Sequence, residues 1–314
     1  MPADRPATTR KFLVRTFGCQ MNEHDSERIA SILAAEGMER TAEVSEADLV
    51  VLNTCCIRQN ADDKLYGTLG HLKSIQAERP GMQIAVGGCL AQKDREHLLD
   101  RAPFVDAVFG THNVGSVARL LADARASGES VIEIHDEASS QDPAEFPIAM
   151  AVREDLPHAA WVTIQMGCDN SCAFCIVPAV RGPEVSRPFG DLLREVEVLA
   201  ANGTVELTLL GQNVNSYGRD LTTRLRSGGT ALPAAALAHE AGEAWVREGA
   251  KAPRPLFADL LRGLGTVPGI RRVRFTSPHP KDLRPETIAA MAETDAVCEQ
   301  LHLPLQAGSD RVLA

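Results

Sequence analysis

Apolar and polar positions follow one another along the chain as short apolar runs and longer amphipathic stretches. Over residues 11–136 this pattern predicts strands that alternate with helices. The expected strands are 11–18, 48–54, 83–87 and 106–109, and the expected helices lie near 25–36, 60–78, 92–100 and 114–125. The strand runs are nearly continuous in apolar residues, as in a parallel sheet that is covered on both faces. Residues 1–136 are therefore predicted to form a doubly wound α/β domain.

A second series of strands and helices is predicted for residues 158–314, after a polar, proline-containing linker over 137–157. The expected strands are 161–166, 205–210, 273–275 and 299–303, and the expected helices lie near 190–201, 256–264 and 285–292. Repeated βα units of this kind predict a full or partial TIM-type barrel. Residues 221–255 have no motif chemistry and are expected to form an inserted, mobile loop, although their middle, 232–247, could form a helix. The chain ends inside a βα unit, so we expect a truncated barrel and a longer parent protein.

Composition adds a broad class to this picture. The chain has 314 residues, of which 44% are hydrophobic and 24% charged, as in a soluble protein of about two domains. No apolar run approaches the roughly 20 residues that span a bilayer, and residues 1–10 lack a signal core. We therefore expect a cytoplasmic protein without a membrane segment. The net charge of −10 argues against nucleic-acid binding through overall charge, and the basic residues at 271, 272, 274, 281 and 284 read as a solvated face.

Three scattered cysteines, Cys19, Cys55 and Cys89, each stand at the end of a predicted strand. Because parallel strands end at the same edge of a sheet, where open α/β sheets bind ligands, the three thiols are expected to lie together. In a reducing cytoplasm they would be thiols or metal ligands rather than disulfides. Three ligands suggest an iron–sulfur cluster with one iron left open. Cys56 is the weaker alternative to Cys55, because neighbouring side chains at a strand end point in opposite directions.

A second set, Cys168, Cys172 and Cys175, has the spacing C-x3-C-x2-C. It lacks the fourth ligand of a zinc site and the spacing of a bacterial ferredoxin, although a zinc knuckle or ordinary loop thiols stay open from spacing alone. Three thiolates on a cubane would leave one iron free for a substrate. The run follows the first predicted barrel strand, which places it at the mouth of the barrel. Phe174 is expected near the cluster, where it would limit solvent access.

The C-x3-C-x2-C run with an aromatic residue before its last cysteine resembles the radical S-adenosylmethionine (SAM) enzymes. Within that superfamily, the contexts of all six cysteines are similar to the methylthiotransferases. The run Leu210–Gly218, with the sequence LGQNVNSYG, resembles their tRNA-modifying MiaB branch. Further support comes from the motifs at residues 181–187, 277–280 and 303–306. The resemblance covers nearly the whole chain apart from residues 221–255.

This resemblance implies a tRNA methylthiotransferase that modifies C2 of N(6)-isopentenyladenosine at tRNA position 37. Cys168, Cys172 and Cys175 would hold a [4Fe–4S] cluster that binds SAM and cleaves it to a 5′-deoxyadenosyl radical. The N-terminal cysteines at 19, 55 and 89 would hold an auxiliary [4Fe–4S] cluster that carries the sulfur, methylated by a second SAM. No catalytic side chain beyond the clusters is implied. The expected partners are tRNA and an electron donor such as flavodoxin or ferredoxin, and we expect a monomer.

Two positions depart from the family pattern, and two other functions compete with this one. Pro183 stands where relatives often have Lys or Arg, and Ala307 where they often have Ser, so affinity for substrate or SAM is expected to differ. A related methylthiotransferase could act on threonylcarbamoyl-adenosine or on a ribosomal-protein aspartate, against which the run 212–217 speaks. A non-enzymatic iron–sulfur carrier would leave the SAM-type loop without a purpose.

Overall fold

The structure is a computed structural model that describes residues 9–56, 59–135, 158–227, 232–249, 252–305 and 307–313. It divides into two compact units. The N-terminal unit comprises residues 1–150 together with 170–182, and the barrel unit comprises residues 151–169 together with 183–314. The predicted linker over 137–157 lies outside the described residues.

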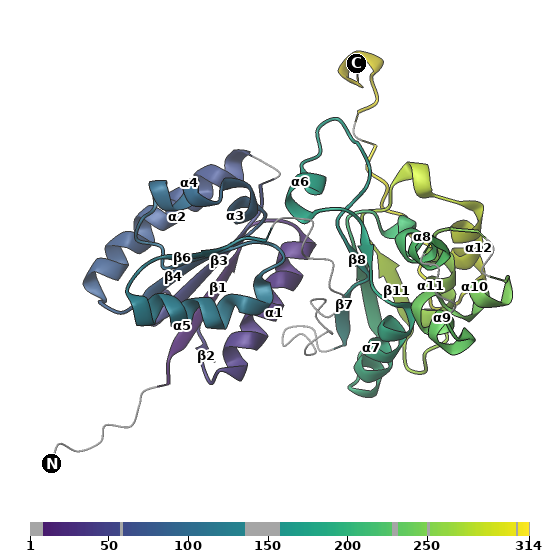
Figure 1. The fold of residues 1–314 in the computed structure, drawn as a ribbon, viewed down its shortest axis with the longest axis horizontal. Coiled ribbons are helices and arrows are strands. Elements are labelled where there is room, and N and C mark those ends of the chain that lie inside the picture. Colours follow the sequence, from purple (N-terminus) through teal and green to yellow (C-terminus); the bar gives the residue numbers. More distant parts are fainter. Residues whose placement is uncertain are drawn as a thin grey trace. The chain divides into compact units, whose positions relative to one another are not determined.

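The N-terminal unit contains a six-stranded, fully parallel sheet in the order β2-β1-β3-β4-β5-β6 (Figure 1). Its strands are β1 (Lys11–Thr16), β2 (Glu39–Arg40), β3 (Leu49–Thr54), β4 (Gln83–Gly88), β5 (Ala107–Phe109) and β6 (Val131–Glu133). The four predicted strands are confirmed as β1, β3, β4 and β5. The edge strands β2 and β6 were not predicted, because two or three residues are too short to show a pattern. The strand order reverses at β1, which has β2 on one side and β3 on the other.

Helices cover both faces of this sheet (Figure 1). One face carries α1 (Gln20–Ala35) and α5 (Val117–Ser127), and the other carries α2 (Gln59–Glu78), α3 (Cys89–Asp94) and α4 (Glu96–Arg101). Val50 packs in the core beneath α2, whereas its neighbour Val51 packs in the core beneath α1. Both faces are therefore buried, and the doubly wound prediction is confirmed. No helix in the described ranges is long and apolar enough to cross a membrane.

The barrel unit contains a parallel sheet in the order β11-β10-β7 and a small antiparallel pair, β8 with β9. The strands are β7 (Ala159–Thr163), β8 (Gln165–Met166), β9 (Val185–Ser186), β10 (Glu206–Leu210) and β11 (Arg272–Phe275), and the main helices are α7 (Phe189–Ala201), α11 (Phe257–Gly265) and α12 (Pro285–Glu293). Strands and helices alternate along the chain, and Leu209 and Val273 of the sheet are fully buried, as is Leu260 of α11. The unit is a partial (β/α) barrel.

The predicted last strand near 299–303 is wrong. In the described part of the chain the segment forms no strand, and only Val297 makes an isolated parallel bridge, to Val273. Leu301, Leu303 and Leu305 alternate as in a strand, but their side chains are 37%, 36% and 80% exposed. Without burial of these side chains, the apolar alternation does not hold the segment on the sheet.

The expectation of a loop over 221–255 is wrong for the described residues, although the helix that the sequence allowed within 232–247 is present as two short helices. The described residues form α8 (Arg219–Ser227), α9 (Ala234–Ala241) and α10 (Glu243–Arg247), and α9 packs against α7. Trp245 is 1% exposed, and its indole Nε1 donates to the carbonyl oxygen of Ala252 at 3.1 Å. The alanine-rich run forms a helix by intrinsic propensity, and the buried indole supplies the apolar area that fixes it.

Candidate metal centres

Cys19, Cys55 and Cys89 lie at the carboxyl edge of three neighbouring strands, β1, β3 and β4. Cys55 directly follows Thr54 of β3 and Cys89 directly follows Gly88 of β4, and these two preceding residues are paired in the sheet register. Cys55 and Cys89 are buried, whereas Cys19 is exposed and forms the N-cap of α1. The sheet therefore fixes the backbone of two thiols side by side and brings the third from the adjacent strand.

A network of amides ties the turn at Cys19 to the end of β3. The Cys19 thiol Sγ lies 3.4 Å from Asn22 Oδ1, and Asn22 Nδ2 donates to the carbonyl oxygen of Thr54 at 3.2 Å. In return, Asn53 Nδ2 donates to the carbonyl oxygen of Asn22 at 2.7 Å. Because Asn22 and Asn53 are almost fully buried, these bonds have little competition from water and hold the edge in one arrangement.

Two glycines let the backbone come close at this edge. A Cβ on Gly18 would lie 2.7 Å from the Cβ of Cys55. Gly88 has φ +93°, and a Cβ there would lie 2.4 Å from Asn53 Oδ1 and 2.5 Å from the carbonyl oxygen of Thr54. Only glycine fits such positions without moving its neighbours. The cysteine edge thus depends on small residues next to two of its thiols.

Gly88→Ala is expected to destabilise the N-terminal unit by about 3 kcal/mol or more, because it combines an unfavourable φ with a clash against backbone. This loss should lower the Tm of the cluster-free protein by roughly 10 °C in a thermal unfolding experiment. The matched control is Gly37→Ala, which has φ +80° but nothing within 4 Å of its added Cβ. It should cost only about 1–2 kcal/mol. Equal Tm values for the two variants would contradict the close approach at Gly88.

The thiols at this edge are electrostatically coupled. A hydrogen bond from Cys56, together with the charge of Arg181 and a hydrogen bond from its side chain, lowers the pKa of Cys89 to about 6, although burial of the thiol opposes this shift. The pKa of Cys56 is raised by the same hydrogen bond and by burial. The lowered pKa favours the thiolate of Cys89, which is the form that binds metal. Cys56 lies beside Cys89, a contact that the sequence pattern did not predict.

A buried guanidinium accompanies these thiols. Arg181 ends the short helix α6 (Val177–Arg181), whose Val180 carbonyl oxygen accepts a hydrogen bond from Thr111 Oγ1 at 2.8 Å. The Arg181 side chain is 4% exposed and pairs through Nη2 with Asp25 Oδ2 at 2.8 Å. Burial opposes its charge, but Cys89 and Asp25 outweigh burial and raise the pKa of Arg181. Sequence reasoning noted Arg181 only as part of a motif and missed this position.

His112 lies near the same ion pair. Both of its ring nitrogens are buried and have no hydrogen-bond partner within the described ranges. Burial, and then the charge of Arg181, lower the pKa of His112 to about 4. The imidazole is therefore neutral at pH 7 and adds no positive charge to that of Arg181.

In the second cysteine set, Cys168 belongs to the barrel unit, and Cys172 and Cys175 belong to the N-terminal unit. Cys168 follows β8 and is buried, whereas Cys172 and Cys175 are exposed. The backbone N–H of Cys175 donates to the carbonyl oxygen of Cys172 at 3.1 Å, so these two ligand candidates share one turn. Phe174 is fully exposed in that turn, and its role beside a cluster stays a prediction.

A group of buried polar side chains with unused hydrogen-bonding atoms lies after β8 and β10 in the barrel unit. Gln165 Nε2 donates to the carbonyl oxygen of Asn213 at 2.8 Å. In the described residues, partners are missing for Gln165 Oε1, Glu184 Oε1, both amide atoms of Gln212, Asn213 Oδ1 and Asp220 Oδ1. Burial raises the pKa of Glu184 to about 7, against a hydrogen bond from Ser216. Unsatisfied buried polar atoms are costly, so this group fits a polar ligand such as SAM.

Each set of three cysteines has the ligand type that an iron–sulfur cluster needs, but the thiols of neither set converge on one point in the described residues. In the described part of the chain, no group of three or more His, Cys, Asp or Glu side chains is arranged to hold a metal ion. All eight cysteines lie in that part, and none forms a disulfide. Three cysteines at one sheet edge, beside glycines and a buried cation, are the donors and charge that a thiolate-bound cluster needs. The six ligand assignments therefore stay proposals.

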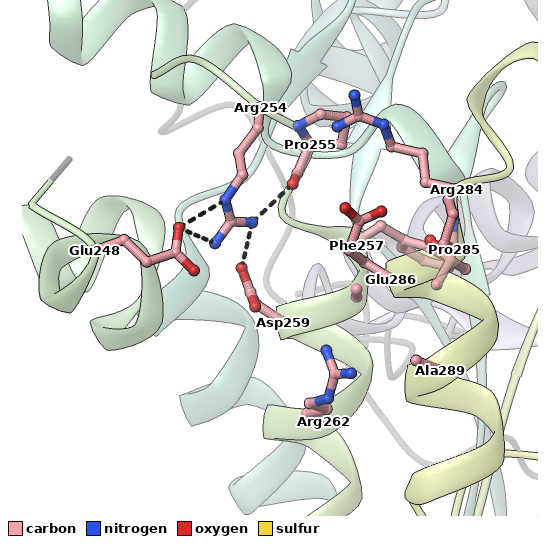
Figure 2. Close-up of a pocket in the computed structure, with 12 residues that line it drawn as sticks. Glu248, Arg254, Pro255, Phe257, Asp259, Arg262, Arg284, Pro285, Glu286 and Ala289 are labelled. Atoms are coloured by element: carbon pink, nitrogen blue, oxygen red, sulfur yellow. Dashed lines mark hydrogen bonds and ion pairs between the residues drawn. The ribbon is translucent and has the colours of Figure 1, made fainter. Parts of the chain in front are cut away.

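A separate surface pocket of about 530 Å³ lies in the barrel unit at the N-terminal ends of α11 and α12 (Figure 2). Arg254 reaches across it to Glu248 at 3.0 Å and to Asp259 at 2.7 Å. Arg284 stands on the opposite rim (Figure 2). Since Glu248 and Asp259 already engage Arg254, this arginine offers little free charge to a polyanion.

Two family matches cover most of the chain. Residues 11–110 match the family described as uncharacterized protein family UPF0004, and residues 162–314 match the radical SAM superfamily. The chain therefore belongs to the radical SAM superfamily, whose cofactors are a [4Fe–4S] cluster and SAM. With its N-terminal match and the relatives described next, it is a member of the radical SAM methylthiotransferase family, as the sequence motifs indicated.

Curated relatives match nearly the whole chain. A tRNA-2-methylthio-N(6)-dimethylallyladenosine synthase of Streptomyces viridosporus is 50% identical over 97% of this chain and 54% of its own length. An enzyme with the same name, numbered 1, from Mycobacterium marinum is 50% identical over 98% of this chain and 54% of its own length. A further one from Acidothermus cellulolyticus is 49% identical over 100% of this chain and 56% of its own length. The chain spans about half the length of the curated relatives it matches.

Proposed function

We propose that this chain is part of a tRNA methylthiotransferase that modifies C2 of N(6)-isopentenyladenosine at tRNA position 37. The observation that carries the proposal is the pair of cysteine triads: one stands at the carboxyl edge of β1, β3 and β4, and the other follows β8 with the spacing C-x3-C-x2-C. The relatives named for this activity, at about 50% identity, support it. An unreactive aromatic C–H needs radical chemistry and a nearby sulfur source, which two separate clusters would provide.

In this proposal, Cys168, Cys172 and Cys175 hold the cluster that binds SAM, and Cys19, Cys55 and Cys89 hold the auxiliary cluster. When bound, the clusters and SAM supply the radical and the sulfur. The buried polar group around Gln165, Glu184 and Gln212 binds and orients the polar parts of SAM through its unused hydrogen-bonding atoms. The N-terminal cysteines bind the auxiliary group as thiolates.

The partners and location complete the proposal. The substrate is tRNA, and a flavodoxin or ferredoxin supplies the electron. Two of the basic residues that stand out in the sequence, Arg272 and Arg274, are already paired with Glu206 at 2.9 Å and 3.0 Å. The main tRNA contacts are therefore proposed to lie elsewhere in the full-length protein. We place that protein in the cytoplasm and expect it to act as a monomer.

The test is anaerobic reconstitution of the full-length protein with iron and sulfide, followed by reaction with SAM, a reductant and isopentenylated tRNA. Mass spectrometry of the digested tRNA should detect the 2-methylthio nucleoside, and the same tRNA without the isopentenyl group should stay unmodified. Methylthiolation of threonylcarbamoyl-adenosine or of a ribosomal-protein aspartate instead would establish the related activity and overturn this substrate. Clusters without any 5′-deoxyadenosine would indicate an iron–sulfur carrier.

A further inference from the structure

Arg181 differs from an ordinary buried ion pair in one respect. Its Nη2 pairs with Asp25, but its Nη1 is buried and has no hydrogen-bond partner in the described part of the chain. Arg187 provides the comparison within the same chain. It is equally buried, its Nη2 pairs with Glu195, and its Nη1 donates to the carbonyl oxygen of Thr163 at 3.0 Å. Both terminal nitrogens of Arg187 therefore have partners within the chain, whereas Nη1 of Arg181 has no hydrogen-bond partner in the described residues.

Arg181 lies close to the N-terminal thiols, because its helix α6 contacts α3, which begins at Cys89. Arg181 acts electrostatically on both Cys89 and Cys19, and it stands in the N-terminal unit because α6 packs there. A buried donor without a partner destabilises the fold, and so does a buried guanidinium unless anions surround it. The Asp25 carboxylate and the Cys89 thiol meet part of this need, and Nη1 still has no acceptor in the described residues. A further acceptor for Nη1 is therefore expected in an anionic group at the cysteine edge.

We propose that Arg181 is a positioning residue of the auxiliary cluster. Its Nη1 donates a hydrogen bond to sulfur of the cluster, and its charge stabilises the reduced, more negative state. This inference rests on the proposed function, because it takes Cys19, Cys55 and Cys89 as the cluster ligands. Net charge and hydrogen bonds to sulfur are among the factors that set the reduction potential of such clusters. The guanidinium should therefore raise the potential, and Asp25 should lower it.

The experiment measures the reduction potential of the auxiliary cluster alone. The background is the full-length protein with Cys172→Ala and Cys175→Ala, reconstituted anaerobically with iron and sulfide and titrated while the reduced cluster is followed by electron paramagnetic resonance. Arg181→Gln removes the positive charge and should shift the potential to a more negative value. Asp25→Asn removes the opposing negative charge and should shift it to a more positive value. Arg181→Lys keeps the charge and should leave the potential close to that of the background protein.

Opposite shifts distinguish this role from a structural one. Breaking the ion pair from either side would loosen the fold in the same way, so a structural role predicts equal effects of Arg181→Gln and Asp25→Asn. Arg187→Gln, which breaks the comparable buried pair, is the matched control and should not move the potential. If Arg181→Gln fails to fold, the positive shift in Asp25→Asn against an unchanged Arg181→Lys supports the inference. The inference would be overturned if neither Arg181→Gln nor Asp25→Asn changed the potential, or if both variants shifted it in the same direction.

Iron analysis separates failure of this inference from failure of the proposed function. The background protein should bind about four iron atoms, as one [4Fe–4S] cluster requires. If the protein binds four iron atoms and the reduction potential does not change on substitution of Arg181, only the role of Arg181 is overturned. If it binds no iron, the auxiliary ligand set is wrong, and the inference falls with it.

Discussion

Full-length protein in which Cys168, Cys172 and Cys175 are replaced by alanine is expected to hold about four iron atoms instead of about eight, and to form no 5′-deoxyadenosine. The reason is that these three thiols are the proposed ligands of the cluster that binds SAM, and the N-terminal triad is untouched. Iron and sulfide analysis of anaerobically reconstituted protein measures the first effect. Chromatography after incubation with SAM and reductant measures the second.

Cys298→Ala is the matched control for this triple variant. Cys298 is a half-buried cysteine of the barrel unit and belongs to neither triad. Its replacement should leave the iron content near eight atoms. If the triple variant keeps all of its iron, Cys168, Cys172 and Cys175 are not cluster ligands.

Replacement of Cys19, Cys55 and Cys89 by alanine is expected to separate the two halves of the reaction. SAM should still be cleaved to 5′-deoxyadenosine, because the C-x3-C-x2-C loop is intact. Methylthiolated tRNA should fall below detection, because the proposed sulfur carrier is gone. Both products are quantified by mass spectrometry from the same reaction, so a general loss of folding would be seen as loss of both.

Cys56→Ala tests the ligand assignment at this edge. Cys55 lies directly beyond β3 and is buried, whereas Cys56 makes a hydrogen bond with Cys89. We expect Cys56→Ala to retain the auxiliary iron and Cys55→Ala to lose it. The reverse result would assign the ligand to Cys56 instead of Cys55. For the variant without Cys19, Cys55 and Cys89, methylthiolation of tRNA would show that the sulfur comes from another site.

The cysteine edge could be predicted because it depends on local signals. The apolar runs that end at Thr16, Thr54 and Gly88 identify β1, β3 and β4, and parallel strands bring their carboxyl ends to one edge. The helix after β1 was placed too late, since α1 begins at Gln20, directly after Cys19. The predicted helix over 92–100 is broken at Arg95, where φ is +49°. A single unfavourable φ leaves no trace in the hydrophobic pattern.

Other features arise from tertiary contacts that no local pattern encodes. Arg181 and Asp25 are 156 residues apart, yet they form a buried ion pair. Their proximity follows from the packing of α6 in the N-terminal unit. The helix allowed within 232–247 was ranked below a loop for a related reason, since composition suggested a loop whereas burial of Trp245 decides the structure. The apolar alternation at residues 301–305 predicted a strand that is absent, because those side chains are exposed in the described chain.

The packing of α6 has a consequence for how such chains can be recombined. Since Arg181 stands beyond the C-x3-C-x2-C run but belongs structurally with Asp25, a cut at the linker does not separate two self-contained modules. A chimera that joins this N-terminal domain to another protein's barrel would set Asp25 against whatever residue replaces Arg181. A mismatch there would leave a buried charge uncompensated, at a cost of about 3–5 kcal/mol. Domain swaps within this family should therefore succeed only when the arginine and the aspartate are transferred together.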